Sequence, residues 1–226
     1  MNILIVAPHP DDEVLGCGGT IAKYANCGDN VFVAIVTKGT SPIFSEESVK
    51  QVRKECIEAD CFLGVKETIF MDFPAVKLEE IPRNVLNLAF VKLVQDLKPN
   101  IVYLPHYGDM QLDHKLTVDA AMVALRPKYN HGVSRIYAYE TLSETGWNVP
   151  NVTNEFIPNL YNDISGYLDK KIDAMCIFKS QLGVFPDSRS LEAIRAMSIY
   201  RGTSMGLSAA EAFMIIREIW GKEKEI

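Results

Sequence analysis

The stretch NILIVAPHPDDE, residues 2–13, decides the fold of this chain. Its first half, residues 2–7, is a continuous aliphatic run, which is typical of a central strand buried on both faces of a parallel sheet. Its second half places one histidine and three acidic residues directly after that strand. Apolar residues then recur at helical spacing from Val14 to Ala25, and the pattern ends near Gly28. We therefore predict a strand, a polar loop at its carboxyl end, and a helix.

Strands and helices alternate along the first half of the chain. The predicted strands are Val31–Thr37, Thr68–Met71 and Ile101–Leu104, and the predicted helices are Glu46–Leu63, Arg83–Asp96 and Asp113–Leu125. This alternation is typical of parallel βαβ units, in which helices cover both faces of a sheet.

The pattern changes after about Val133. Strands are predicted at Arg135–Glu140 and Glu155–Asn162, and helices near Gly166–Phe178 and Leu191–Tyr200. Because the chain contains no repeat, low-complexity segment or flexible linker, we predict a single domain over residues 1–226. Its fold class is α/β, with a doubly wound, mostly parallel, Rossmann-like sheet flanked by helices.

Composition narrows the class of protein. Of the 226 residues, 48% are hydrophobic and 23% are charged, which is typical of a soluble globular protein. The five cysteines are an odd number without CxxC spacing, which favours a reducing compartment over a disulfide framework or a thiolate zinc site. A net charge of −6 without a Lys/Arg block argues against a nucleic-acid partner. The N-terminal apolar run is too short for a signal peptide or a membrane span, so we expect a cytoplasmic protein without a membrane partner.

The acidic cluster after the first strand is the first candidate site. Ligands of open α/β sheets bind at the carboxyl ends of strands, and clustered carboxylates there are costly unless a cation or a helix N-terminus offsets their charge. A divalent metal would do so, with His9 and one of the two aspartates, Asp11 or Asp12, as ligands and the other aspartate free as a base. The alternative is that these acids only cap the following helix. That alternative explains one acid, but neither the histidine nor the whole cluster.

The glycine-rich run after the cluster, Gly16–Thr20, has two interpretations. It could cradle a phosphate, but it has neither GxGxxG order nor a P-loop lysine, and it follows acids that would repel phosphate. We favour the other interpretation, that these glycines let the helix pack close to the sheet.

A second motif, residues 109–114 (DMQLDH), follows the strand Ile101–Leu104 and opens the next helix. A zinc hydrolase needs three protein ligands and one open position, and His9, Asp12 and His114 would form such a set. Asp113 is suited to orient a histidine or the catalytic base. The other two histidines, His106 and His131, are expected to be ordinary loop residues, although His106 could line the pocket.

These motifs resemble those of the LmbE/PIG-L-like zinc-dependent N-deacetylase family. The hexapeptide PHPDDE and the glycine-bearing helix after it match the family signature, and residues 109–114 are similar to its DxHxDH segment. Residues 53–55 with 63–65 are similar to its RxE…LGV segment. Residues 171–181, 200–202 and 210–213 are similar to its C-terminal signatures, so the resemblance covers most of the chain.

The resemblance implies removal of the acetyl group from an N-acetylglucosamine-type amide, releasing acetate and a free amino sugar. It implies one zinc ion per chain on His9, Asp12 and His114, Asp11 as general base, and Arg53 and Asp109 in contact with the substrate. Asp113 is expected among the catalytic residues. Relatives often associate, so a homo-oligomer stays open.

One position departs from the family pattern. Gln111 stands where the family commonly has a histidine that stabilises the transition state. A glutamine amide can donate a hydrogen bond to an oxyanion, but it cannot carry the positive charge of an imidazolium. Either Gln111 donates as a neutral group, or another residue takes this role, or the substrate differs.

Two other functions remain open on sequence grounds. The metal site could belong to an amidase that acts on a thiol-sugar or antibiotic conjugate. A non-catalytic module that binds a sugar or nucleotide is the other alternative, but it has no need of a spare carboxylate beside a metal. Specificity is expected to lie in the rim segments Ser41–Ser48, Tyr137–Val149 and Phe185–Arg189.

Overall fold

The predicted N-terminal strand is an internal strand of a seven-stranded sheet. The structure, a computed structural model, describes residues 1–129, 132–152 and 154–221. β1 (Asn2–Ala7) pairs in parallel with β2 (Asn30–Lys38) on one side and β4 (Ile101–Pro105) on the other. The sheet order is β3-β2-β1-β4-β5-β7-β6. β3 (Glu67–Pro74) and β5 (Arg135–Tyr139) extend the parallel part. Because the strand order reverses between β1 and β4, their carboxyl ends form the switch point where such sheets bind ligands.

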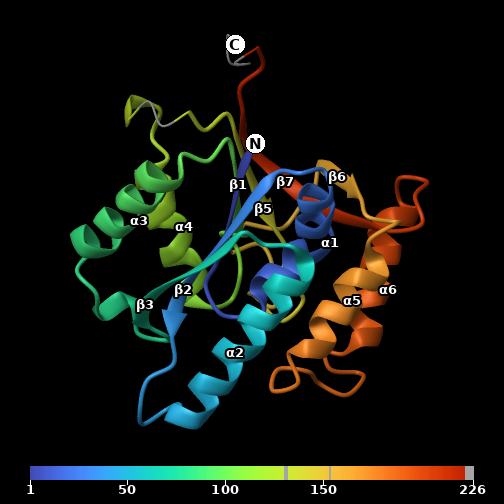
Figure 1. Cartoon of the computed structure of the whole chain (residues 1–226), viewed down its shortest axis with the longest axis horizontal. Helices are drawn as coiled ribbons and strands as arrows, with labels where there is room; N and C mark the ends of the chain where they lie inside the picture. The colour runs from blue at the N-terminus through green and yellow to red at the C-terminus, as the bar shows by residue number, and fades with distance from the viewer. Residues whose placement is uncertain (130–131, 153, 222–226) are drawn as a thin grey trace.

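Helices cover both faces of this sheet (Figure 1). One face carries α1 (Asp12–Asn26), α2 (Glu46–Leu63), α5 (Leu168–Ile177) and α6 (Leu191–Thr203). The other face carries α3 (Arg83–Leu97) and α4 (Leu112–Ala124), and short 3-10 helices span Leu78–Glu80 and Pro127–Tyr129. Alternate side chains of β1 enter the two cores, Ile3 and Ile5 on one face and Leu4 and Val6 on the other. This confirms the predicted doubly wound architecture.

In the part of the chain that the structure describes, no helix is both long and apolar enough to cross a membrane.

The last part of the sheet differs from the prediction. β7 (Ala210–Glu218), which the sequence analysis did not identify as a strand, runs antiparallel between β5 and β6. Its buried residues include Glu211, which breaks the aliphatic pattern expected of an internal strand. The strand predicted at residues 155–162 was wrong in its first half, because β6 comprises only Leu160–Asp163.

The glycines of α1 allow close packing, as predicted. A Cβ atom on Gly16 would lie 2.2 Å from the ring of Tyr139 on β5, and one on Gly19 would lie 2.8 Å from Ile164. The Tyr139 hydroxyl in turn donates a 2.8 Å hydrogen bond to the carbonyl of Val6. Any side chain at Gly16 would push α1 away from the strand end that carries the candidate site.

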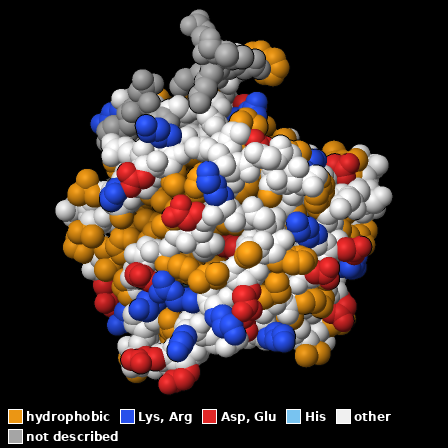
Figure 2. Space-filling model, in the orientation of Figure 1, with side chains coloured by type: hydrophobic (Ala, Val, Ile, Leu, Met, Phe, Trp, Pro, Cys, Tyr) orange, Lys and Arg blue, Asp and Glu red, His pale blue; other side chains and the backbone are white. Residues whose placement is uncertain are grey.

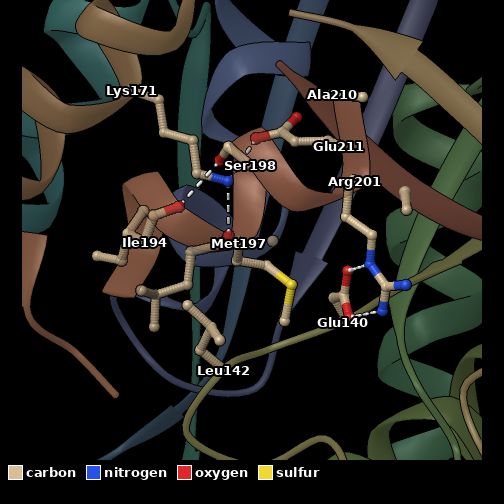
Figure 3. A pocket seen from close by; sticks show the side chains of 12 residues that line it. Glu140, Leu142, Lys171, Ile194, Met197, Ser198, Arg201, Ala210 and Glu211 are labelled. Carbon is tan, nitrogen blue, oxygen red and sulfur yellow. Dashed lines mark hydrogen bonds and ion pairs between the residues drawn. The ribbon is translucent and has the colours of Figure 1, made fainter. Parts of the chain in front are cut away.

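A buried ion pair joins the middle of α1 to the C-terminal part of the chain. Lys171 of α5 lies 2.6 Å from Glu211 of β7, and also donates to the carbonyl of Leu15 (Figure 3). The Glu211 carboxylate accepts hydrogen bonds from the backbone N–H groups of Gly19 and Thr20, at 2.9 and 2.7 Å. A buried charge pair is tolerated when further hydrogen bonds satisfy it, as they do here.

Candidate metal centre

The three predicted metal ligands meet at the switch point. His9 follows β1, Asp12 opens α1, and His114 lies in the first turn of α4. Asp12 Oδ2 is 3.3 Å from His9 Nδ1 and 3.3 Å from His114 Nε2. One ligand atom from each residue lies within 4.8 Å of the others. Asp12 and His114 are fully buried, whereas 19% of the His9 side chain is exposed.

Carboxylates behind both imidazoles fix which nitrogen faces the centre. His114 Nδ1 is 2.8 Å from Asp109 Oδ2, which leaves the buried Nε2 facing Asp12 without a hydrogen bond. His9 Nε2 is 3.0 Å from Asp113 Oδ2, which also accepts a hydrogen bond from the N–H of Val76. Carboxylate–histidine pairs of this kind orient metal-binding imidazoles. Two imidazoles and a carboxylate, with one imidazole nitrogen left unbonded, fit a divalent zinc-like ion.

The charges of these groups depend on one another. Burial alone would raise the pKa of Asp12, but the two imidazoles hold it far below its usual value. Burial likewise lowers the pKa of His114, but Asp12 and Asp109 raise it to about 10. The centre therefore concentrates negative charge that attracts either protons or a cation.

Asp11 is held in a strained conformation beside this centre. Its φ of 114° lies in the left-handed region, which is uncommon for residues other than glycine. Its N–H donates to Glu13 Oε2 at 3.0 Å. Asp11 occupies the N-cap position of α1, but its side chain makes no capping hydrogen bond. Helix capping therefore does not account for this acid.

The Asp11 carboxylate is buried and free to accept a proton. Neither oxygen has a hydrogen-bond partner, although Arg189 Nε lies 3.3 Å from Oδ2. Burial and the nearby Asp12 raise the pKa of Asp11 to about 7, against the opposing effect of Arg189 and the two imidazoles.

A cleft opens from this carboxylate toward α2, and it brings together most of the remaining predicted residues. His9, Asp11, Arg53 and Gln111 all line it. Arg53 stacks 4.1 Å from the centre of the Phe70 ring and forms a 2.5 Å ion pair with Asp72. Gln111 is half-buried, and its Oε1 has no hydrogen-bond partner.

Asp109 is the exception among the predicted site residues. Its carboxylate is fully buried behind His114, and its other oxygen accepts a 2.6 Å hydrogen bond from Thr145. This placement argues against the predicted contact with the substrate, because both oxygens are engaged and neither faces the cleft. His106 also lies outside the cleft, against Asn154 and Phe156, and His131 lies outside the described residues.

The cleft also contains polar residues to which the sequence analysis assigned no individual role. Arg189 and Gln181 both line it. Arg189 ends the predicted rim segment 185–189, and Gln181 ends the segment 171–181 that resembles the family. Their positions in irregular chain gave no periodic pattern that would predict where their side chains point.

A second acidic cluster lies behind Asp11. Glu13, Cys56 and Asp60 are all buried, and Thr68 donates a 2.6 Å hydrogen bond to Asp60. Burial raises the pKa of Asp60 from 3.8 to about 7. Folding therefore favours the protonated form of this acid.

Asp60→Asn should remove a pH-dependent loss of stability. In the unfolded chain Asp60 ionises near pH 4, whereas the folded chain resists ionisation until about pH 7. Its contribution to the free energy of unfolding is therefore fully present below pH 4 and is lost as the pH rises to 7. The loss is at most about 4 kcal/mol. Urea unfolding at pH 4.5, 6 and 7.5 should show that the free energy of unfolding of the variant increases, relative to that of the native protein, as the pH rises. Asp96→Asn, at an exposed site, is the control; a pH-independent difference for Asp60→Asn would contradict the prediction.

Three candidate ligands, two of them fully buried, around a free carboxylate at the carboxyl edge of an α/β sheet are what a metal-dependent hydrolase requires. Comparisons with known proteins agree with this class. Residues 4–125, more than half of the chain, match the family model described as PIG-L: GlcNAc-PI de-N-acetylase. The chain therefore belongs to the PIG-L family, whose members are amide hydrolases.

Individual relatives span nearly the whole fold. The chain is 29% identical to a probable N-acetyl-alpha-D-glucosaminyl L-malate deacetylase of Bacillus anthracis, over 80% of this chain and 81% of that protein. It is 27% identical to the uncharacterized deacetylase YaiS of Escherichia coli (strain K12), over 79% of this chain and 91% of that protein. The crystal structure of a conserved protein from Thermus thermophilus superimposes with a TM-score of 0.78 at 28% identity. That match covers 96% of this chain and 95% of the other.

Proposed function

We propose that this protein hydrolyses the acetamide of an N-acetylglucosamine-type substrate, releasing acetate and the free amino sugar. The observation that carries this proposal is the unbonded, buried carboxylate of Asp11 beside the His9–Asp12–His114 set. A purely binding protein gains nothing from a strained, unbonded acid in that place. Family membership and the names of the relatives support the choice of an amino-sugar amide.

His9, Asp12 and His114 are the residues that would hold the metal, and we propose zinc. When bound, zinc acidifies water and polarises a carbonyl group. Asp109 and Asp113 hold the two imidazoles with one nitrogen toward the centre, so that they act through the ligands.

Asp11 is proposed as the general base and then the general acid. It takes a proton from the attacking water as the water oxygen bonds to the acetamide carbon. It returns that proton to the amide nitrogen as the carbon–nitrogen bond breaks, which makes the amine a competent leaving group. Arg189, 3.3 Å away, steadies the ionised form that accepts the proton.

Gln111 and Arg53 are proposed to position the substrate. Gln111 occupies the N-cap position of α4, three residues before His114, and its side-chain N–H₂ group can donate a hydrogen bond to the developing oxyanion. Arg53 is held by Asp72 and Phe70, and we propose that its remaining N–H groups bind a substrate oxygen.

Acetate release from zinc-loaded protein tests the proposed function. The substrates are the methyl glycoside of N-acetylglucosamine, N-acetylglucosamine 1-phosphate and N-acetylglucosaminyl malate, with their N-propionyl analogues. We expect stoichiometric acetate and free amine from at least one acetyl substrate, and none after chelation. An amidase for larger acyl groups would instead prefer the propionyl series. Tight sugar binding that survives chelation, without any acid release, would favour the non-catalytic module.

Two expectations from the sequence stay predictions, namely zinc as the bound divalent ion and a cytoplasmic location. The oligomeric state stays open. A single functional unit over residues 1–226 is likewise part of the proposal. It is supported by the contacts that join α1 to α5 and β7.

A further inference from the structure

The active-site cleft continues outward into a second cavity beside α2. The inner part reaches His9 and Asp11, and the outer part is bounded by the end of β2 and the first turns of α2. The two parts share one wall, formed by Lys38, Gly39, Phe44, Val49 and Arg53. A substrate whose acetamide lies at Asp11 can therefore extend past Arg53 into the outer cavity.

This outer cavity is lined by two lysines that form no ion pair with any of the described residues. Lys38 and Lys50 line it with exposed side chains, and neither forms an ion pair or a side-chain hydrogen bond within residues 1–129, 132–152 and 154–221. Glu46 is the one acid among the lining residues described, and it lies beyond ion-pair distance of both lysines. Figure 2 shows Lys and Arg side chains over the end of β2 and along α2, with acidic side chains among them. The residues that line the cavity nevertheless carry more basic than acidic side chains, in a chain whose net charge is −6.

The backbone holds the inner lysine at a fixed place relative to the centre. Lys38 is the last residue of β2, and its neighbour Thr37 donates a 2.8 Å hydrogen bond to the carbonyl of Pro8, next to His9. The N–H of Ala75 bonds the Lys38 carbonyl at 2.9 Å. Lys50 lies on α2, one turn before Arg53, so that the cations follow one another along the cleft.

We propose that the substrate carries an anionic group, a carboxylate or a phosphate, beside its acetamido sugar, and that Lys38 and Lys50 bind this group. This inference rests on the proposed function for the place of the sugar. Arg53 is already paired with Asp72, so the two free ammonium groups supply the uncompensated charge. Phe44 and Val49 also line the cavity and offer an apolar surface to the sugar or its linker.

Binding to a variant that cannot turn over separates this inference from catalysis. Metal-loaded Asp11→Asn protein is titrated calorimetrically with the neutral methyl glycoside, the 1-phosphate and the malate conjugate. We expect an anionic sugar to bind at least about tenfold more tightly than the neutral one, since hydrogen bonds to charged groups are among the stronger ones. The preference should shrink as salt screens the lysines.

Substitutions of the two lysines, compared with a third lysine outside the cleft, provide the matched comparison. Lys50→Ala alone, and together with Lys38→Ala, should lose this preference while binding the neutral glycoside as before. Lys54→Ala is the control, because Lys54 lies on the same helix, 67% exposed, and pairs with Glu58 away from the cleft. Equal binding of neutral and anionic sugars, or a preference that survives in the double variant, would overturn the inference. If the lysine-dependent preference holds but no substrate is hydrolysed by the native enzyme, the inference stands and the proposed function fails.

Discussion

Asp11→Asn protein that has been loaded with zinc should keep the metal yet release acetate at least about 10²-fold more slowly than the native protein. Asp11 does not belong to the predicted ligand set, so the metal should stay bound. Its amide replacement has the same shape but cannot take the proton of the attacking water. Asparagine also tolerates the positive φ of 114° at this position, whereas most other residues would be strained by it. The measurements are zinc content after dialysis and kcat for acetate release.

Two results would remove Asp11 from this role. Turnover within a few-fold of the native rate would mean that another group moves the proton. Loss of zinc would mean that Asp11 is a ligand. Asp119→Asn, at a partly exposed acid on α4 that pairs with Arg83, controls for the loss of one negative charge and should leave both readouts unchanged.

His114→Ala should abolish stable metal binding. It deletes one of three ligands, and no other histidine among the described residues lies at the centre apart from His9. Asp109→Asn should have a smaller effect, lowering the metal affinity by about 10–100-fold, because it weakens only the hydrogen bond that orients His114. Competition with a chromogenic chelator gives both affinities, and circular dichroism verifies that each variant is folded.

The relative size of the two losses in metal affinity tests whether His114 is a ligand and whether Asp109 only orients it. If Asp109→Asn kept full metal affinity but raised KM for the sugar, the original prediction of a substrate contact would be restored against the geometry. If His114→Ala bound zinc as tightly as the native protein, the ligand set would be wrong.

The sequence predicts the parallel part of the fold because its signals are local. Aliphatic runs mark buried strands, and Gly64 ends α2 where the helical pattern stops, with the positive φ that favours glycine. The three predicted metal ligands lie together because the two motifs that contain them follow strands whose carboxyl ends meet. The sequence alone left open whether Asp11 only caps α1. The structure argues against this alternative, because the Asp11 side chain makes no capping hydrogen bond.

The features that the sequence did not reveal depend on contacts between distant segments. β7 was missed because Glu211 interrupts its apolar pattern, and only the fold shows that Lys171 and α1 satisfy that carboxylate. Arg189 reaches Asp11 from a loop without periodicity. The direction of the Asp109 side chain, toward His114 instead of the cleft, depends on the backbone path of a turn that sequence spacing does not define.

The hydrogen bonds between α1 and Glu211 of β7 have a consequence for how the enzyme becomes active during its synthesis. The hydrogen bond from Gly19 to Glu211 joins residues 192 positions apart. Contacts of such long range form late, since the intervening chain must first be ordered. The segment that matches the family model contains every predicted metal ligand. Its first helix, α1, is nevertheless hydrogen-bonded to Glu211 of β7, which lies outside that segment. A chain of which only the N-terminal half has been synthesised is therefore expected to remain inactive, and we expect stable metal binding only after β7 has joined the sheet.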